Sequence, residues 1–137
     1  MTSLAVIVSR GEYNSLVQVA TLLMAAVGSG IAVRVFFRDE AIYKITRTEA
    51  TEVNLSGGYR GREAEVRANL TRQSLHDLPD LLRQVKERGD ARLYACSSSL
   101  AICGVRPDEL LPEIDGVRGL TAFLLEDIAK ADRVLTF

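Results

Sequence analysis

The sequence has no tryptophan, one histidine, three prolines and two cysteines. Four-ligand zinc sites in proteins are built mainly from cysteine and histidine, and nothing in this sequence arranges carboxylates around His76 to replace them. The spacing of Cys96 and Cys103 fits neither a CxxC redox pair nor a zinc knuckle. Because no export signal is apparent, we expect two free thiols, no disulfide and no metal.

An excess of charge of one sign is also missing. The 137 residues include 17 basic and 18 acidic residues, which gives a formal net charge of -1 and no field to hold a polyanion, so we expect no nucleic acid partner. The longest apolar region, residues 16–31, is interrupted by polar residues and glycines and falls short of the ~20 residues of a membrane helix. We expect no membrane segment, no signal peptide and a cytoplasmic location.

Strand and helix patterns alternate along the chain. Short apolar runs at 4–8, 31–37 and 91–95, with weaker ones at 117–120 and 133–137, are typical of buried strands. Apolar residues recur at helical spacing in 13–27, 41–46, 74–88, 97–103 and 121–129. This order predicts an α/β fold, a three-layer α/β/α domain with a mostly parallel sheet of about five strands. The length fits a single domain, 1–137.

Two features depart from a simple alternation. Residues 47–72 are polar, contain Gly57, Gly58 and Gly61, and form a longer connection than compact domains usually have; we expect an excursion with a helix at 62–71, serving as a lid, a docking arm or a disordered segment. The helix at 13–27 is apolar on its second face as well, so we expect an oligomer to bury that face. The residues of this face are Val17, Val19, Leu22, Ala25 and Ala26.

Binding groups in parallel sheets gather beyond the carboxyl ends of the strands. Three segments lie there, 9–11, 38–40 and 96–99, and no nucleotide-binding glycine motif is present. Cys96 stands between a strand and a helix, where free amides and the helix dipole stabilise a thiolate and lower its pKa. The hydroxyls of Ser97, Ser98 and Ser99 would add hydrogen bonds. Arg10, Arg38 and Arg118 are candidates for attracting an anion.

Each candidate also has a simpler interpretation. Free cysteine often behaves as a small buried hydrophobe, so Cys96 is either reactive or part of the core. Cys103 lies two helical turns further on, ~10 Å along the axis, and is either a core residue or a second thiol. A solvent-exposed or capping role explains His76 without a Cys–His dyad.

Several segments resemble the DsrE/DsrF-like family. They are Leu93-Tyr94-Ala95-Cys96-Ser97-Ser98-Ser99-Leu100, Gly104, Gly119-Leu120-Thr121-Ala122-Phe123 and Ala131-Asp132-Arg133-Val134-Leu135-Thr136-Phe137. The resemblance covers most of the chain apart from 47–72. It implies a sulfur-relay protein in which the cysteine matching Cys96 accepts sulfane sulfur as a persulfide and passes it to a partner cysteine, without a cofactor. It also implies oligomers, often trimers or hexamers, and exchange with TusA-like carriers.

Other functions fit the same sequence. The chain would be a non-catalytic, regulatory subunit if Cys96 were buried and Arg10 or Arg38 held a small anion. A thiol peroxidase would oxidise Cys96 and resolve it with Cys103, which requires Cα atoms within about 7 Å. A structural subunit of a hetero-oligomer is a further alternative.

Overall fold

The computed structural model describes residues 1–137, and its centre is a five-stranded sheet of order β4-β3-β2-β1-β5 with parallel neighbours throughout. The strands are β1 (Ser3–Val8), β2 (Ala32–Phe37), β3 (Ala91–Cys96), β4 (Gly116–Arg118) and β5 (Arg133–Thr136). The α-helices are α1 (Tyr13–Gly28), α2 (Ala41–Lys44), α3 (Glu63–Arg72), α4 (Leu78–Arg88), α5 (Ser97–Cys103) and α6 (Leu120–Glu126). The predicted α/β class with about five strands is confirmed.

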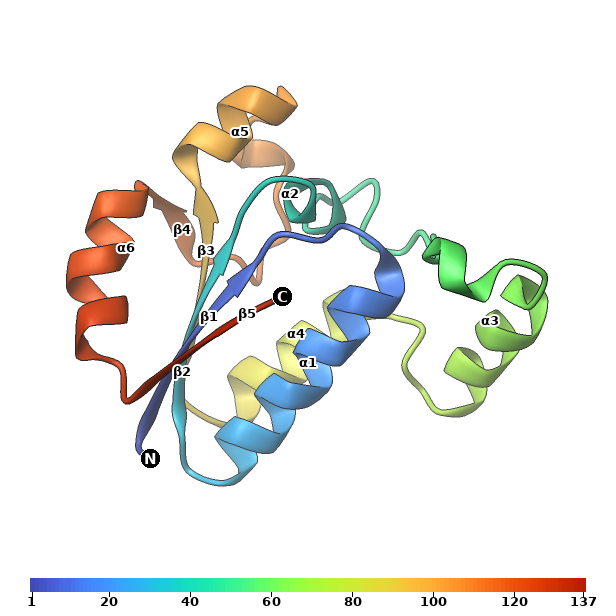
Figure 1. Cartoon of the computed structure of the whole chain (residues 1–137), viewed down its shortest axis with the longest axis horizontal. Helices are drawn as coiled ribbons and strands as arrows, with labels where there is room; N and C mark the ends of the chain where they lie inside the picture. Colours follow the sequence, from blue (N-terminus) through green and yellow to red (C-terminus); the bar gives the residue numbers. More distant parts are fainter.

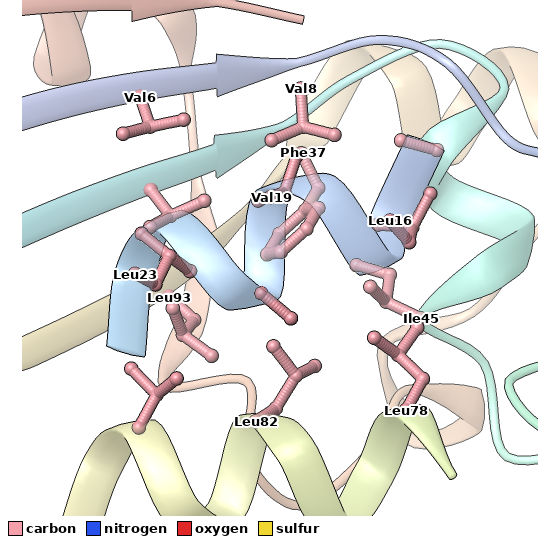
Figure 2. Packing of buried hydrophobic residues seen from close by; sticks show 14 of the residues in the cluster. Val6, Val8, Leu16, Val19, Leu23, Phe37, Ile45, Leu78, Leu82 and Leu93 are labelled. Atoms are coloured by element: carbon pink, nitrogen blue, oxygen red, sulfur yellow. The ribbon is translucent and has the colours of Figure 1, made fainter. Parts of the chain in front are cut away.

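The two faces of the sheet are covered unequally. Helices α1 and α4 pack on one face, while α6 lies on the other (Figure 1). Alternate residues of the strands, such as Val6, Val8 and Phe37, point toward α1, and Leu78 and Leu82 of α4 complete a large apolar core (Figure 2). The core under α6 is much smaller and consists of Ala5, Phe36, Cys96 and Phe123.

The second face of α1 is covered within the chain itself. Val17, Val19 and Ala26 are buried, Leu22 is half-buried, and only Ala25 is exposed. The reason is that α1 contacts the sheet on one side and α4 on another, so a helix that is apolar all round loses most of its water contact. The expectation that an oligomer buries the second face of α1 is therefore wrong.

The boundaries of α4 and α6 differ from the predicted ones. Helix α4 begins at Leu78 rather than Ser74, because the carboxylate of Asp77 accepts a hydrogen bond from the Asp80 amide at 3.2 Å and caps the helix there. Helix α6 begins at Leu120 and ends at Glu126, whereas the predicted helix covered 121–129. Its orientation buries Phe123 completely but leaves Leu124 47% exposed.

The polar segment 47–72 projects beyond α1 and α4 (Figure 1). It contains a short 3-10 helix, Gly57–Tyr59, and α3, none of whose residues is buried. Its base is fastened to the domain, since the Tyr13 amide donates to the Asn54 carbonyl at 2.8 Å and the Ser56 amide donates to Asn14 Oδ1 at 3.0 Å. None of the helices has the length and apolar character needed to cross a membrane.

Candidate functional site

Cys96 is the last residue of β3 and the N-cap of α5. Ala95 pairs with Phe37 in the sheet, so Cys96 and Arg38 follow side by side at the carboxyl ends of β3 and β2. The alternation of the strand turns Cys96 toward the α6 face, where it packs with Ala5, Phe36 and Phe123. Its relative exposure is 0%, so the thiol is part of the smaller core as well as a strand-end residue.

Polar groups surround the sulfur despite this burial. The Sγ atom lies 3.2 Å from Ser98 Oγ, and Ser98 itself is exposed. Burial raises the pKa of Cys96. The opposing effect is larger and lowers this pKa to about 7; it comes from the hydroxyls of Ser98 and Ser99, the Ser99 amide and the Arg38 side chain. The Ser99 amide acts by proximity, without a full capping hydrogen bond to the sulfur. A larger fraction of this thiol is therefore ionised at neutral pH than of an ordinary cysteine.

Arg38 supplies the positive charge of the site. Its Nε atom is buried and has no hydrogen-bond partner, and no carboxylate lies within salt-bridge distance of its guanidinium. An unpaired, partly buried cation is costly unless an anion shares its environment. The Cys96 thiolate, or an anionic group bound beside it, meets that need.

The side chains of the other two arginine candidates make different contacts. Arg10 lines a separate hollow of about 580 Å³ with Ser15, Gln18, Thr136 and Phe137, at the ends of β1 and β5. Arg118 pairs with Cys96 in the register of β3 and β4, but its guanidinium donates to Glu126 at 2.7 Å and to Asp127 at 2.8 Å and stacks over the Tyr94 ring at 4.1 Å. Of the three arginines, Arg38 is the one whose side chain acts on the thiol.

The three serines differ in what they contact. Ser97 is exposed, and its Oγ would lie 3.9 Å from a Cβ added at Gly119, which shows that α5 and α6 begin close together. Ser98 reaches the sulfur from the solvent side. Ser99 is buried, and its Oγ accepts a hydrogen bond from the Asp39 amide at 3.0 Å. Ser98 and Ser99 thus belong to the thiol environment, whereas Ser97 lies at its rim.

Cys103 is half-buried and packs against the large core, whereas Cys96 belongs to the smaller one. Its thiol donates to the Asp39 carbonyl at 3.5 Å, and Tyr43 interacts with the same sulfur, which raises the pKa of Tyr43. His76 is exposed in the loop before α4 and does not meet either cysteine. Sequence reasoning missed Asp39 and Tyr43. The position of Asp39 between Arg38 and Glu40, in a segment expected at the strand ends, was the available signal.

No group of three or more histidine, cysteine, aspartate or glutamate side chains is arranged to hold a metal ion. The chemistry that the site can perform is therefore that of its thiol, its hydroxyls and one guanidinium. A thiolate with a pKa near neutrality combines a useful ionised fraction with good nucleophilicity.

Comparisons with known proteins agree with this fold. The model of the DsrE/DsrF-like family matches residues 2–137. The structure of a protein of unknown function, MTH1491 from Methanobacterium thermoautotrophicum, is similar over 98% of this chain and 99% of that chain, with a TM-score of 0.55 and 16% sequence identity. At that identity the likeness concerns the fold alone. No curated protein shows significant sequence similarity to this chain.

Proposed function

This chain belongs to the DsrE/DsrF-like family, and on that premise we propose that it is a sulfur carrier or sulfurtransferase that holds sulfane sulfur as a persulfide on Cys96. The family is associated with sulfur relay. The observation that carries the proposal is the convergence of Ser98, Ser99 and Arg38 on one thiol, whose pKa is lowered to about 7 against the opposing effect of burial. Catalytic thiols are found in electropositive surroundings of this kind.

The transfer would proceed in two displacements. The Cys96 thiolate attacks the outer sulfur of a donor persulfide, R–S–SH; the S–S bond of the donor breaks, R–S⁻ leaves, and Cys96 becomes the persulfide. A thiolate of the acceptor protein then attacks the terminal sulfur and Cys96 returns to the thiolate. No net oxidation occurs, so neither a metal nor an organic cofactor is needed for this route.

The residues around Cys96 have separate roles in this scheme. Arg38 stabilises the attacking thiolate and the negative charge of the incoming sulfur compound, because its guanidinium is not neutralised by a carboxylate. Ser98 and Ser99 donate hydrogen bonds to the sulfur that carries charge. Ser97, at the rim, is available to a bound donor or acceptor.

Burial of Cys96 requires that the site opens during transfer. The Ser98 hydroxyl, which is in contact with the sulfur, belongs to an exposed residue, and α5 is a helix of seven residues with exposed neighbours at Ala101 and Ile102. Displacement of this short helix by an acceptor would uncover the sulfur. Such local opening is expected where few buried contacts hold an element.

We further propose a TusA-like or related sulfur-relay protein as the partner, and a homo-oligomer, trimer or hexamer, as the assembly. Exposed apolar side chains support self-association, and they lie on α6 and β5 rather than on α1: Leu120, Leu124, Leu125, Val134 and Leu135. A cytoplasmic location would keep the Cys96 thiol reduced between transfers.

A second candidate function is a non-catalytic subunit that binds a small anion at Arg38. The observation in its favour is the complete burial of Cys96, which suits a structural thiol better than an exchanging one. In this case a bound anion, not a persulfide, would satisfy the buried Nε of Arg38.

Intact-protein mass spectrometry separates the two. The wild type, Cys96→Ser and Cys103→Ser are exposed briefly to polysulfide or thiosulfate and weighed before and after reduction. The sulfur-carrier proposal expects sulfur additions that reductant removes and that only Cys96→Ser abolishes. No addition to the folded wild type, together with anion-dependent stabilisation that persists in Cys96→Ser, would replace it with the anion-binding function.

A further inference from the structure

The turn after β2 is held by α5 at both main-chain groups of Asp39. The Asp39 amide donates to Ser99 Oγ at 3.0 Å, and the Cys103 thiol donates to the Asp39 carbonyl at 3.5 Å. Ser99 and Cys103 are four residues apart and so lie on one side of the helix. The turn 38–40 and α5 are therefore fastened together by two side chains of α5.

Asp39 adopts a backbone conformation that depends on such contacts. Its φ is 50°, in the left-handed region that non-glycine residues occupy rarely. On the opposite side of the turn, a Cβ added at Gly11 would lie 2.6 Å from the Glu40 carbonyl oxygen, so the loop after β1 already touches the turn. Main-chain hydrogen bonds also hold the turn, since the Arg38 amide donates to the Val8 carbonyl at 2.8 Å and the Ile42 amide donates to the Asp39 carbonyl at 3.1 Å. The two contacts from α5 add to these bonds and connect the turn to the helix that begins at Cys96.

The contacts of Asp39 are connected to the proposed reactive sulfur through Ser99 and Arg38. The Ser99 hydroxyl accepts from the Asp39 amide and keeps its own proton for Cys96, and linked hydrogen bonds of this kind strengthen one another. Two arginines adjoin Cys96: Arg38 acts on its sulfur, and Arg118 of β4 pairs with Cys96 in the sheet but donates to Glu126 and Asp127. The residues that pack on Cys96 from β1, β2 and α6 are Ala5, Phe36 and Phe123, which carry no charge. Tyr43 and Asp39 face Cys103.

We propose that Cys103 is a positioning residue for Cys96, its thiol fixing Asp39 so that Ser99 and Arg38 stay directed at the reactive sulfur. This inference rests on the proposed function, because a reactive Cys96 is what Cys103 would position, but the contacts of Cys103 are present whether or not sulfur is transferred. A positioning role also differs from that of a resolving thiol, which would form a disulfide with Cys96. The two cysteines are separated by ~10 Å along α5, whereas a disulfide needs Cα atoms within about 7 Å.

Single-thiol variants provide the test. Cys103→Ser and Cys103→Ala each leave Cys96 as the sole thiol, but only serine retains a hydrogen-bond donor. Ultraviolet titration of the Cys96 thiolate is expected to show a midpoint near that of the wild type in Cys103→Ser, and a higher midpoint in Cys103→Ala. A shift of half to one pH unit corresponds to a roughly 3- to 10-fold smaller thiolate population at pH below the midpoint. Ser99→Ala, which removes a direct donor, calibrates the size of the shift.

Equal midpoints in Cys103→Ser and Cys103→Ala would overturn the positioning role. If Cys103→Ala does not fold, Cys103→Val, which fills the site without a donor, takes its place in the comparison. Alkylation of the wild type by iodoacetamide, quantified at Cys96 by peptide mass spectrometry, gives the reference profile. Sulfur uptake is measured separately on the same proteins: wild type that takes up no sulfur refutes the proposed function, while the titration decides the positioning role.

Discussion

Phe123 of α6 stacks on Phe36 of β2, with ring centroids 4.5 Å apart and ring planes 9° apart. Tyr94 meets Phe123 edge-on, at a centroid distance of 6.4 Å. Phe36 and Phe123 are completely buried and share their small core with Cys96. Because α6 is the helix that covers this face of the sheet, one aromatic side chain both anchors α6 and shields the thiol.

Replacing Phe123 should therefore affect stability and thiol access together. We expect Phe123→Ala to lower the free energy of unfolding by about 3–5 kcal/mol, the usual cost of removing a buried aromatic ring, and to accelerate alkylation of Cys96. Urea unfolding and peptide-resolved alkylation measure the two effects. Leu124→Ala, in the same helix but 47% exposed in the wild type, should change stability by about 0.5 kcal/mol or less. Similar effects of both substitutions would show that α6 does not dock through Phe123.

Arg38 and Arg10 allow a matched comparison of two guanidinium groups at the same edge of the sheet. Burial raises the pKa of Cys96. The hydroxyls of Ser98 and Ser99 lower this pKa, and Arg38 adds to that lowering. We expect Arg38→Gln to raise this pKa and to reduce alkylation of Cys96 at pH 7 by roughly 3- to 10-fold, with slower uptake of sulfur from thiosulfate. Arg10→Gln should leave both rates unchanged, since Arg10 lines a different hollow. The assignment of Arg38 fails if the two variants behave alike.

The sheet was predictable because its three central strands are short, mainly apolar runs that end at polar residues, a pattern local to the sequence. Segment 91–95 is an example, and it placed Cys96 correctly at a strand end next to a helix. Helix boundaries that depend on competing caps were harder to predict. Ser74 and Asp77 both resemble helix caps, but only the Asp77 carboxylate accepts a hydrogen bond from an amide of the helix. Local patterns thus located the element but not its first residue.

Features set by distant contacts escaped prediction for a different reason. The sequence does not reveal that Arg118 forms salt bridges with Glu126 and Asp127, because that pairing depends on where α6 crosses the sheet. The same crossing brings Phe123 onto Cys96 and buries it. Likewise α4, which covers the second face of α1, lies about fifty residues further along the chain, so α1 alone looked exposed. These contacts exist only once the sheet order is fixed.

Ionisation of Cys96 should make stability depend on pH in one direction. The pKa in the folded protein is about 7, lower than the ordinary thiol value near 9 that holds in the unfolded chain. Between these values the unfolded state binds more protons, so the free energy of unfolding rises with pH from about 7 to 9 and the contribution is lost as pH falls through 7. We expect the stability of the wild type relative to Cys96→Ser to increase by an amount on the order of 1 kcal/mol between pH 6 and pH 9. Urea unfolding at both pH values measures it, and a constant difference would mean that the folded thiol is not preferentially ionised.

Lys44 fastens the base of the polar excursion to α2. Its side chain is buried, and Nζ donates to the carbonyl oxygens of Glu49 at 3.1 Å and Glu52 at 2.8 Å. Burial lowers the pKa of Lys44, against the opposing effect of the Glu52 and Glu49 carboxylates. The side chain thus acts here as a donor to two main-chain acceptors of the excursion.

Lys44→Met keeps the apolar stem and removes the donor. Leaving two carbonyls without this partner should lower the free energy of unfolding by about 1–3 kcal/mol and should speed proteolytic cleavage within 47–72, because the segment loses a fixed point near its base. Lys130→Met, at an exposed lysine near the start of β5, is the matched control and should have little effect on either measurement. If Lys44→Met is as stable and as protease-resistant as Lys130→Met, the excursion is held by its other contacts, chiefly the hydrogen bonds of Asn54 and Ser56 to the start of α1.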